Sequence, residues 1–291
     1  MAAAISGIIP ALVTPFAGDG TLAVRQVGVL VERLIGEGAS GFYVGGSTGE
    51  CFLLSLEERT RLFAAAVEAA RGRARVICHV GAIATAHAVE LARFAESVRA
   101  DAVSSVPPFY YKFTLAEIKG HYHALMEATG LPLIIYNIPA LSGVTISLDN
   151  SADLLADPRI GGVKHTSSDF YQLERIKHRF PHLAVLNGYD EMFLAGLAMG
   201  ADGAIGSTYN LMTPRFVRIR ELAARGALAE ARGLQRGAND FIAVLLEVGI
   251  FPAIKYALRC RGIDAGECRA PFAPLGGEQK RRVDAALERL G

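Results

Sequence analysis

The sequence alternates eight times between a short apolar run and a longer amphipathic segment. The runs are rich in Val, Ile and Leu and lack the polar alternation of a half-exposed strand. Near-continuous apolar runs are typical of parallel strands covered on both faces, and eight strand–helix units make a TIM barrel. We therefore expect an α/β fold, a TIM (β/α)8 barrel, with strands at residues 7–14, 41–44, 75–80, 102–106, 132–136, 161–164, 183–186 and 203–206.

The segments between the apolar runs carry helical signals. In residues 56–71, Leu62, Ala66 and Ala69 fall on one stripe with charged residues opposite. Ser55 precedes this segment and is followed by two glutamates, which is the pattern of a helix N-terminus. Thr114 precedes a second such segment in the same way.

After the eighth apolar run only helical patterns remain. Gly226, Gly249 and Gly262 are expected helix ends, because glycine adopts the left-handed conformation of a C-cap without strain. These signals predict helices at residues 214–225, 227–247, 251–261 and 278–290. We expect a barrel over residues 1–213 and an all-helical extension over residues 214–291 that packs on it.

Composition excludes several classes of function. A formal net charge of +1 gives no electrostatic reason to expect nucleic acid or an anionic membrane as a partner. No apolar run is long enough to span a bilayer, and residues 1–6 lack the basic start of a signal peptide, so we expect a cytoplasmic protein. The histidines lack metal-ligand spacing and the four cysteines form no C-x-x-C pair, so we expect no metal site.

Lys164 stands at the far end of an apolar, strand-like run, in the segment Gly161–Ser167. A buried amine without a partner favours its neutral form, a nucleophile that condenses with ketones to give a Schiff base. The position is equally consistent with a lysine paired to a buried carboxylate. The other five lysines fall in segments that resemble loops or solvated helix faces: Lys112, Lys119, Lys177, Lys255 and Lys280.

Polar side chains follow most of the expected strands at their carboxyl ends. Because these ends meet at one rim of a TIM barrel, where active sites of this fold lie, we expect the groups to converge. They occur at residues 45–50, 107–111, 136–139, 164–167, 187–191 and 206–208.

Two of these segments suggest particular chemistry. The Gly45–Gly46 turn can present backbone N–H groups to an anion, and Ser47 and Thr48 add hydroxyl donors, which suits a small carboxylate. Tyr136 can shuttle a proton, because a phenol both donates and accepts. An ordinary βα turn and a hydrogen-bonded core tyrosine are the structural alternatives. The turn lacks both the lysine of a P-loop and the spacing of a dinucleotide fingerprint.

These rim segments, in this order, resemble the pyruvate-dependent class I aldolases of the dihydrodipicolinate synthase/N-acetylneuraminate lyase family. The resemblance covers the whole chain and implies a Schiff-base lysine at Lys164, with Tyr136 as a proton relay. It also implies that Ser47 or Thr48 assists the relay and that Tyr110 reaches into a neighbouring subunit's site. A homotetramer built as a dimer of dimers is the implied assembly. The matching residues are Gly45–Glu50, Tyr110–Tyr111, Tyr136–Pro139 and Gly162–Lys164.

Within this family, the segment Tyr136–Gly143 is similar to the N-acetylneuraminate lyase branch. Leu141 stands where dihydrodipicolinate synthases usually carry an arginine that holds the carboxylate of the aldehyde substrate, and leucine cannot form that pair. Asp190 and Glu191 match an acidic pair that binds sugar hydroxyls in this branch, although the first turn of a helix explains such a pair equally well. The other substrate-binding residues that the resemblance implies are Thr166, Gly188, Ser207 and Phe251, the last closing the pocket over the sugar.

The resemblance implies cleavage of N-acetylneuraminate into N-acetylmannosamine and pyruvate through an imine on Lys164. The ligands are then a 2-keto acid and a sugar aldehyde, with no metal, nucleotide or other cofactor. The nearest alternatives are an aldolase or dehydratase acting on another 2-keto-3-deoxy sugar acid, and dihydrodipicolinate synthase. A non-catalytic ligand-binding protein is disfavoured by the intact Lys164 and Tyr136. A phosphate-binding barrel enzyme is disfavoured because no basic residue accompanies the turn at residues 203–208.

Overall fold

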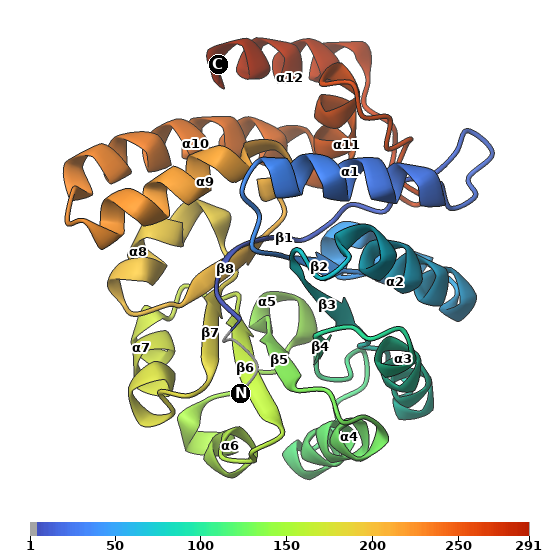
Figure 1. Cartoon of the computed structure of the whole chain (residues 1–291), viewed down its shortest axis with the longest axis vertical. Coiled ribbons are helices and arrows are strands. Elements are labelled where there is room, and N and C mark those ends of the chain that lie inside the picture. The colour runs from blue at the N-terminus through green and yellow to red at the C-terminus, as the bar shows by residue number, and fades with distance from the viewer. Residues whose placement is uncertain (1–4, 291) are drawn as a thin grey trace.

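Eight parallel strands, all within residues 5–290, form one sheet that curves into a barrel (Figure 1). The computed structural model describes residues 5–290, so the beginning of the N-terminal segment interpreted above lies outside the described residues. The expected TIM barrel and all eight expected strands are confirmed. The strands are β1 (Gly7–Pro10), β2 (Gly41–Val44), β3 (Arg75–His79), β4 (Ala102–Ser105), β5 (Leu133–Asn137), β6 (Ile160–His165), β7 (Ala184–Asn187) and β8 (Gly203–Gly206).

The barrel closes between the first two strands. The other neighbours pair in parallel, in the order β1-β8-β7-β6-β5-β4-β3-β2, with one register shift between β5 and β6 at Leu133 and Ile134. β1 and β2 meet through a single parallel bridge between Ala11 and Tyr43. The backbone N–H of Ser40 donates to the carbonyl of Ile8 at 2.8 Å, and the N–H of Leu12 donates to the carbonyl of Tyr43 at 2.9 Å. The strand ends that carry the candidate site therefore lie on a continuous rim.

Helices surround the strands and cover the outer face of the sheet (Figure 1). Ser55 and Thr114 form capping boxes at the starts of two of them, as the sequence predicts. Three short 3-10 turns, η1 (Ser47–Gly49), η2 (Cys51–Leu53) and η3 (Asp190–Met192), lie after β2 and β7. The helices are α1 (Val24–Gly36), α2 (Leu56–Ala70), α3 (Thr85–Ser97), α4 (Leu115–Ala128), α5 (Pro139–Ser142), α6 (Leu148–Leu155), α7 (Phe170–Arg179), α8 (Phe193–Ala198) and α9 (Tyr209–Ala224).

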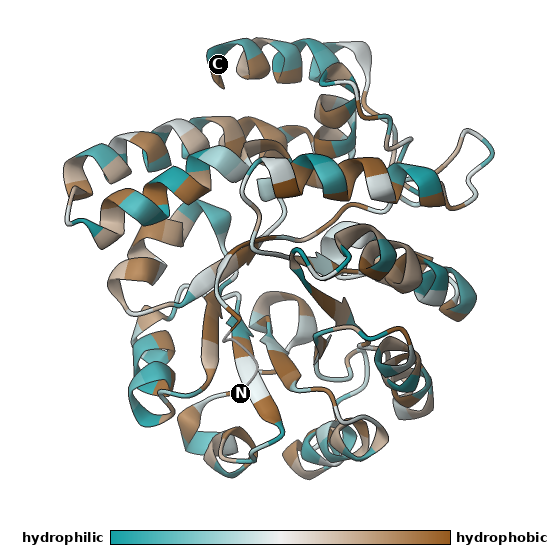
Figure 2. Ribbon diagram, viewed as in Figure 1, coloured by the Kyte–Doolittle hydropathy of each residue, from teal (hydrophilic) through white to brown (hydrophobic). Residues whose placement is uncertain are grey.

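Side chains alternate along each strand between the barrel interior and the layer beneath the helices. In β2, Phe42 and Val44 join the outer core whereas Tyr43 joins the interior. In β6, Val163 belongs to the outer core, so the next residue, Lys164, faces the interior. Figure 2 shows the same division, with largely brown strands inside a ring of helices that are banded brown and teal.

The C-terminal extension contains α10 (Leu228–Val248), α11 (Ile250–Cys260) and α12 (Gly277–Leu290), drawn orange to red in Figure 1. Gly226, Gly249 and Gly262 follow their helices with φ of 75°, 102° and 84°, as expected of helix ends. Among the described residues no single helix is long and apolar enough to cross a bilayer. Of the described helices, only α10 and α11 taken together are long and apolar enough to cross a bilayer, and they are bent by 116° at their junction.

One helix start differs from the prediction. α9 begins at Tyr209, so Pro214, the expected first residue, lies inside the helix. The backbone is non-helical at Met212, with φ −130° and ψ 22°. Because this break interrupts the helix two residues before Pro214, the proline occupies a position like the first turn of a new helix, where its missing N–H carries little cost.

Candidate active site

Lys164 lies inside the barrel near the carboxyl ends of the strands, and its side chain meets aromatic rings. The residue is 5% exposed. Its Nζ atom lies 3.7 Å from the ring centre of Tyr136 and 4.4 Å from that of Tyr43. Within residues 5–290 no carboxylate forms an ion pair with Lys164, whereas twelve other such pairs exist. Of the two interpretations that the sequence leaves open, the structure therefore favours the unpaired amine.

Lys255 is the lysine that pairs with a buried carboxylate. It lies on α11, is fully buried, and its Nζ is 2.7 Å from Oε1 of Glu50, whose side chain is equally buried. Nζ also donates to the carbonyl of Glu267 at 3.1 Å and lies 4.2 Å from the ring centre of Phe16. The prediction that every lysine except Lys164 lies in a loop or on a solvated face is wrong here. Helical periodicity gave no sign that a loop after β2 packs onto this position.

Tyr136 is the neighbour of Lys164 across β5 and β6, where the two residues are register partners. It is buried, and its ring packs edge-on against Tyr43 with centroids 5.8 Å apart. The hydroxyl of Tyr43 donates to Oγ of Ser104 at 3.0 Å, and burial raises the pKa of Tyr43 well above its usual value. Tyr43 was missed by the sequence analysis. The strand alternation of residues 41–44 was the signal, because it turns this one polar-tipped side chain inward.

The glycine turn after β2 has a shape that larger residues cannot take. Gly45 has φ 68°, and a Cβ on Gly46 would lie 2.5 Å from the ring of Tyr43. His79 fixes the turn from β3, with Nδ1 2.9 Å from the carbonyl of Gly45. Burial lowers the pKa of His79 well below its usual value, so the ring is neutral, and Nδ1 carries the proton because a carbonyl only accepts.

The hydroxyls of this turn reach the end of the last strand. Thr48 is buried, and its Oγ1 lies 2.6 Å from Oγ of Ser207, which follows β8. Ser47 is half-buried and opens η1 beside a cavity. The turn and the β8 loop, 159 residues apart in the sequence, therefore form one polar edge, as the rim argument predicts.

Asp190 is buried at the end of β7 and is held by Thr208. Its Oδ2 accepts hydrogen bonds from the backbone N–H and from the hydroxyl of Thr208, both at 2.7 Å. Burial is the main cause that raises the pKa of Asp190 to about 6. A Cβ on Gly206 would lie 1.8 Å from Oδ1, so the glycine leaves space for the carboxylate. The side chain thus points to the β8 loop rather than capping α8.

Glu191, the other half of the acidic pair, has no cation partner. Within the described part of the chain neither Asp190 nor Glu191 forms an ion pair. The carbonyl of Glu191 accepts a hydrogen bond from Asn239 on α10 at 3.0 Å. Carboxylates that lack a cation remain free to accept hydrogen bonds from hydroxyl groups.

Thr166 and Gly188 meet where β6 and β7 end. A Cβ on Gly188 would lie 1.8 Å from Oγ1 of Thr166, so only glycine fits there. Oγ1 of Thr166 is buried and has no hydrogen-bond partner among residues 5–290. A polar atom in that position costs stability unless a ligand or water satisfies it.

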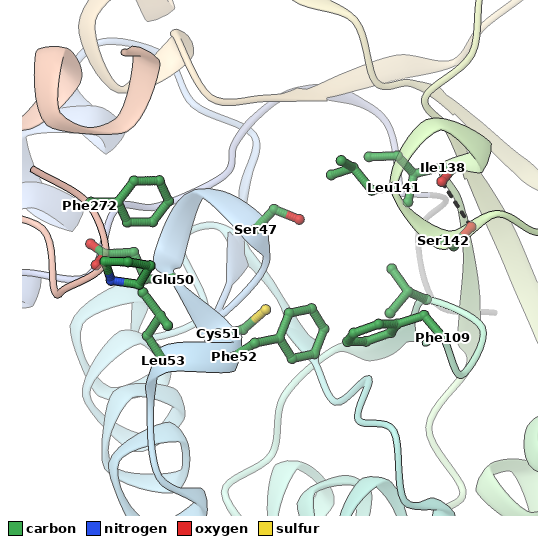
Figure 3. A pocket seen from close by; sticks show the side chains of 12 residues that line it. Ser47, Glu50, Cys51, Phe52, Leu53, Phe109, Ile138, Leu141, Ser142 and Phe272 are labelled. Carbon is green, nitrogen blue, oxygen red and sulfur yellow. Dashed lines mark hydrogen bonds between the residues drawn. The ribbon is translucent and has the colours of Figure 1, made fainter. Parts of the chain in front are cut away.

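A cavity of about 310 Å³ opens beside Ser47 (Figure 3). Figure 3 shows the Ser47 hydroxyl directed into the hollow and the rings of Phe52 and Phe109 side by side. Their centres are 4.6 Å apart and their planes are inclined by 60°. Leu141 and Phe272 line the cavity as well. Lys164 is not among its lining residues, so this cavity adjoins the lysine cluster and does not contain it.

Two expected site residues lie apart from the lysine cluster. Phe251 does not line the cavity; its ring packs at 87° against Phe272, which does, with centroids 5.6 Å apart. Tyr110 is 84% exposed, has φ 79° and packs against Tyr111, so within one chain it does not join Lys164. Within residues 5–290 there is no group of three or more His, Cys, Asp or Glu side chains arranged to hold a metal ion.

Comparison with known proteins places the chain in a family. Residues 4–290 match the Dihydrodipicolinate synthetase family, and the chain belongs to it. The N-acetylneuraminate lyase of Rhizobium meliloti (strain 1021) is 48% identical over 269 residues, which are 92% of this chain and 89% of that protein.

Solved structures of sialic-acid enzymes share the fold closely. The structure of CdNal from Clostridium difficile in complex with mannosamine is 38% identical, with a TM-score of 0.96 over 99% of each chain. The sialic acid aldolase of Ruminococcus gnavus, solved as a catalytic lysine mutant, is 30% identical, with a TM-score of 0.95 over 98% of this chain and 95% of that one. The recognised family and the barrel are therefore confirmed together.

Proposed function

We propose that this protein is a Schiff-base class I aldolase, a carbon–carbon lyase that reversibly cleaves N-acetylneuraminate to N-acetylmannosamine and pyruvate. The observation that carries the proposal is the buried Lys164, packed against two tyrosine rings and without a carboxylate partner among residues 5–290. The relatives named N-acetylneuraminate lyase and the aldolase solved as a mutant of its catalytic lysine support the same reading.

The proposed reaction begins with the neutral amine of Lys164. The nitrogen attacks C2 of the open-chain keto acid, water leaves, and a protonated imine forms. The C4 hydroxyl loses its proton, the C3–C4 bond breaks, and its electron pair forms the C2=C3 double bond of an enamine while the C2=N pair returns to nitrogen. N-acetylmannosamine leaves as the aldehyde. Protonation of C3 and addition of water then release pyruvate and restore the amine. The imine is the electron sink, so the reaction as proposed needs no external cofactor.

Tyr136 is the proposed proton relay, since it is the register partner of Lys164 and its ring lies against the amine. Ser47 or Thr48 would assist it, and both would hold the pyruvyl carboxylate together with backbone N–H groups of the Gly45–Gly46 turn. Leu141, at the edge of the cavity, offers no cation for the second carboxylate of a dihydrodipicolinate synthase substrate.

The sugar end is proposed to lie toward β7 and β8. There Asp190 and Glu191 are carboxylates that form no ion pair in the described part of the chain, and they are suited to accept hydrogen bonds from sugar hydroxyls. Phe251 is proposed to act on the pocket through Phe272. The other proposed contacts at this end are Thr166, Gly188 and Ser207.

The assembly is proposed to be a homotetramer, a dimer of dimers, with a cytoplasmic location. Tyr110 and Tyr111 are 84% and 65% exposed, so their rings are free to pack against another subunit. Sedimentation equilibrium would measure the mass in solution. A purely monomeric protein would remove the role of Tyr110 in a neighbouring site.

The first test measures pyruvate release from N-acetylneuraminate with lactate dehydrogenase as the coupling enzyme. Release at a rate proportional to enzyme, together with borohydride trapping of pyruvate on Lys164, is the expected result. Trapping of pyruvate without cleavage of N-acetylneuraminate would reject the sialic-acid assignment and retain the imine chemistry. A panel of 2-keto-3-deoxy sugar acids would then identify the substrate.

A further inference from the structure

Two side-chain amides on α10, those of Gln235 and Asn239, form hydrogen bonds to the backbone of the loop that carries Asp190 and Glu191. Gln235 is buried, with 7% of its surface exposed. Its Nε2 donates to the carbonyl of Asp190 at 3.0 Å and to Oδ1 of Asn239 at 2.8 Å. Its Oε1 accepts from the backbone N–H of Leu194 at 3.1 Å. Asn239 in turn donates from Nδ2 to the carbonyl of Glu191 at 3.0 Å.

The two amides therefore hold the backbone of η3 and the start of α8 from outside the barrel. Gln235 and Asn239 are four residues apart on α10, so they lie one above the other on the same face of the helix. A neutral amide is the group that suits this position, because it donates to a carbonyl and accepts from an N–H without burying a charge. A carboxylate would meet the carbonyl of Asp190 with no hydrogen to donate.

The positions of the Asp190 and Glu191 carboxylates depend on these amide hydrogen bonds to different degrees. The carboxylate of Asp190 is also fixed by two hydrogen bonds from Thr208. The carboxylate of Glu191 makes no hydrogen bond or ion pair within residues 5–290. Its location is therefore set by the backbone of η3, which Gln235 holds at the carbonyl of Asp190 and Asn239 holds at the carbonyl of Glu191.

We propose that Gln235 and Asn239 are positioning residues for the sugar end of the substrate, acting chiefly through Glu191. This inference rests on the proposed function and extends it, because it gives the helical extension a part in choosing the aldehyde. The pyruvate end is expected to be less affected, because within residues 5–290 neither amide hydrogen-bonds to Ser47, Thr48 or the Gly45–Gly46 turn.

The test compares Gln235→Met and Asn239→Ala with a matched control, Gln279→Met. Gln279 lies on α12 in the same extension, where its side chain donates to the carbonyl of Val248 and accepts from the N–H of Gly276. The control thus removes two similar amide hydrogen bonds away from η3. Three quantities are measured in the synthetic direction: KM for N-acetylmannosamine, kcat, and the pyruvate concentration that half-saturates borohydride trapping.

We expect Gln235→Met and Asn239→Ala each to raise KM for N-acetylmannosamine by about tenfold, the equivalent of one hydrogen bond. Trapping of pyruvate stays within about twofold of wild type, because neither amide makes a hydrogen bond to the Gly45–Thr48 turn. Gln279→Met leaves both quantities unchanged. In a Glu191→Ala background, Asn239→Ala adds little, because the group that it positions is absent.

Equal changes in pyruvate trapping and in KM for N-acetylmannosamine would overturn the proposal, because they would show that the amides stabilise the fold without positioning the sugar end. An unchanged aldehyde KM in a folded variant would do the same. Asn239→Asp provides a second variant if Gln235→Met does not fold. The aspartate keeps an oxygen that accepts from Gln235 but has no N–H to donate to the carbonyl of Glu191. Failure of the proposed function is seen separately, because the wild-type protein itself would then not join pyruvate to N-acetylmannosamine.

Discussion

Replacing Asp190 by Asn is expected to stabilise the protein above pH 6 while weakening its action on the sugar. The carboxylate is buried, and burial raises its pKa from 3.8 to about 6. Asn is nearly isosteric and keeps an oxygen that accepts both hydrogen bonds from Thr208. The substitution therefore removes the cost of a buried negative charge without leaving the Thr208 donors unpaired.

The magnitude follows from the difference in pKa between the folded and unfolded chains. Because the folded value is the higher one, Asp190 stabilises the fold below pH 3.8, and this contribution is lost as the pH rises through about 6. Its full size is about 3 kcal/mol, and the part gained between pH 8 and pH 5 is about 1.4 kcal/mol. The free energy of unfolding of the wild type, relative to Asp190→Asn, should rise by that amount on acidification.

Urea unfolding of both proteins at pH 8 and pH 5, at one fixed protein concentration, measures the difference. The chain contains no tryptophan, so far-ultraviolet circular dichroism is the suitable signal. A relative stability that does not change between the two pH values would refute the reasoning, since it would mean that Asp190 does not titrate in this range. In parallel, KM for N-acetylneuraminate should rise in the variant, because a site carboxylate is lost.

Three further predictions test the remaining assignments. Lys164→Ala should abolish both turnover and borohydride trapping of pyruvate in a protein with an unchanged circular dichroism spectrum; appreciable residual lyase activity would exclude Lys164 as the imine-forming residue. Tyr136→Phe should keep pyruvate trapping and slow cleavage by about a hundredfold or more, as measured by the coupled assay, because only the hydroxyl that relays the proton is removed. Wild-type turnover in that variant would remove the relay. Lys255→Met should lower the free energy of unfolding by about 3–5 kcal/mol, because it strands the buried carboxylate of Glu50. Adding Glu50→Gln should recover much of that loss in chemical denaturation, and strictly additive losses would contradict the ion pair.

The strands and their order around the barrel were predictable from the sequence. Buried parallel strands leave continuous apolar runs, and the connection of each strand to a helix leaves one topology for eight of them. The start of α9 was not predictable, because proline usually begins a helix and only the backbone break at Met212 allows Pro214 to lie inside one. Pattern reasoning locates elements better than it locates irregularities within them.

The polar rim was predictable as a set, since strand-end residues of a barrel must converge. The residues that hold the rim in place were not predictable. Gln235 and Asn239 lie on a helix of the extension, and nothing in their spacing shows that they meet a loop more than forty residues earlier in the chain. Sequence position determines which residues reach the rim, whereas the residues that hold the rim in place depend on how the extension packs.

The contrast between the two buried lysines explains why only one of them suits imine chemistry. Lys255 faces Glu50 at 2.7 Å, and any reaction that neutralised its ammonium would leave that carboxylate buried and uncompensated. Lys164 instead lies against the rings of Tyr43 and Tyr136. A ring face attracts a cation but carries no net charge, so it tolerates the amine as ammonium, as a neutral nucleophile and as a protonated imine in turn. Under the proposed function, apolar and aromatic walls, rather than a counter-ion, would therefore allow Lys164 to change its charge during turnover.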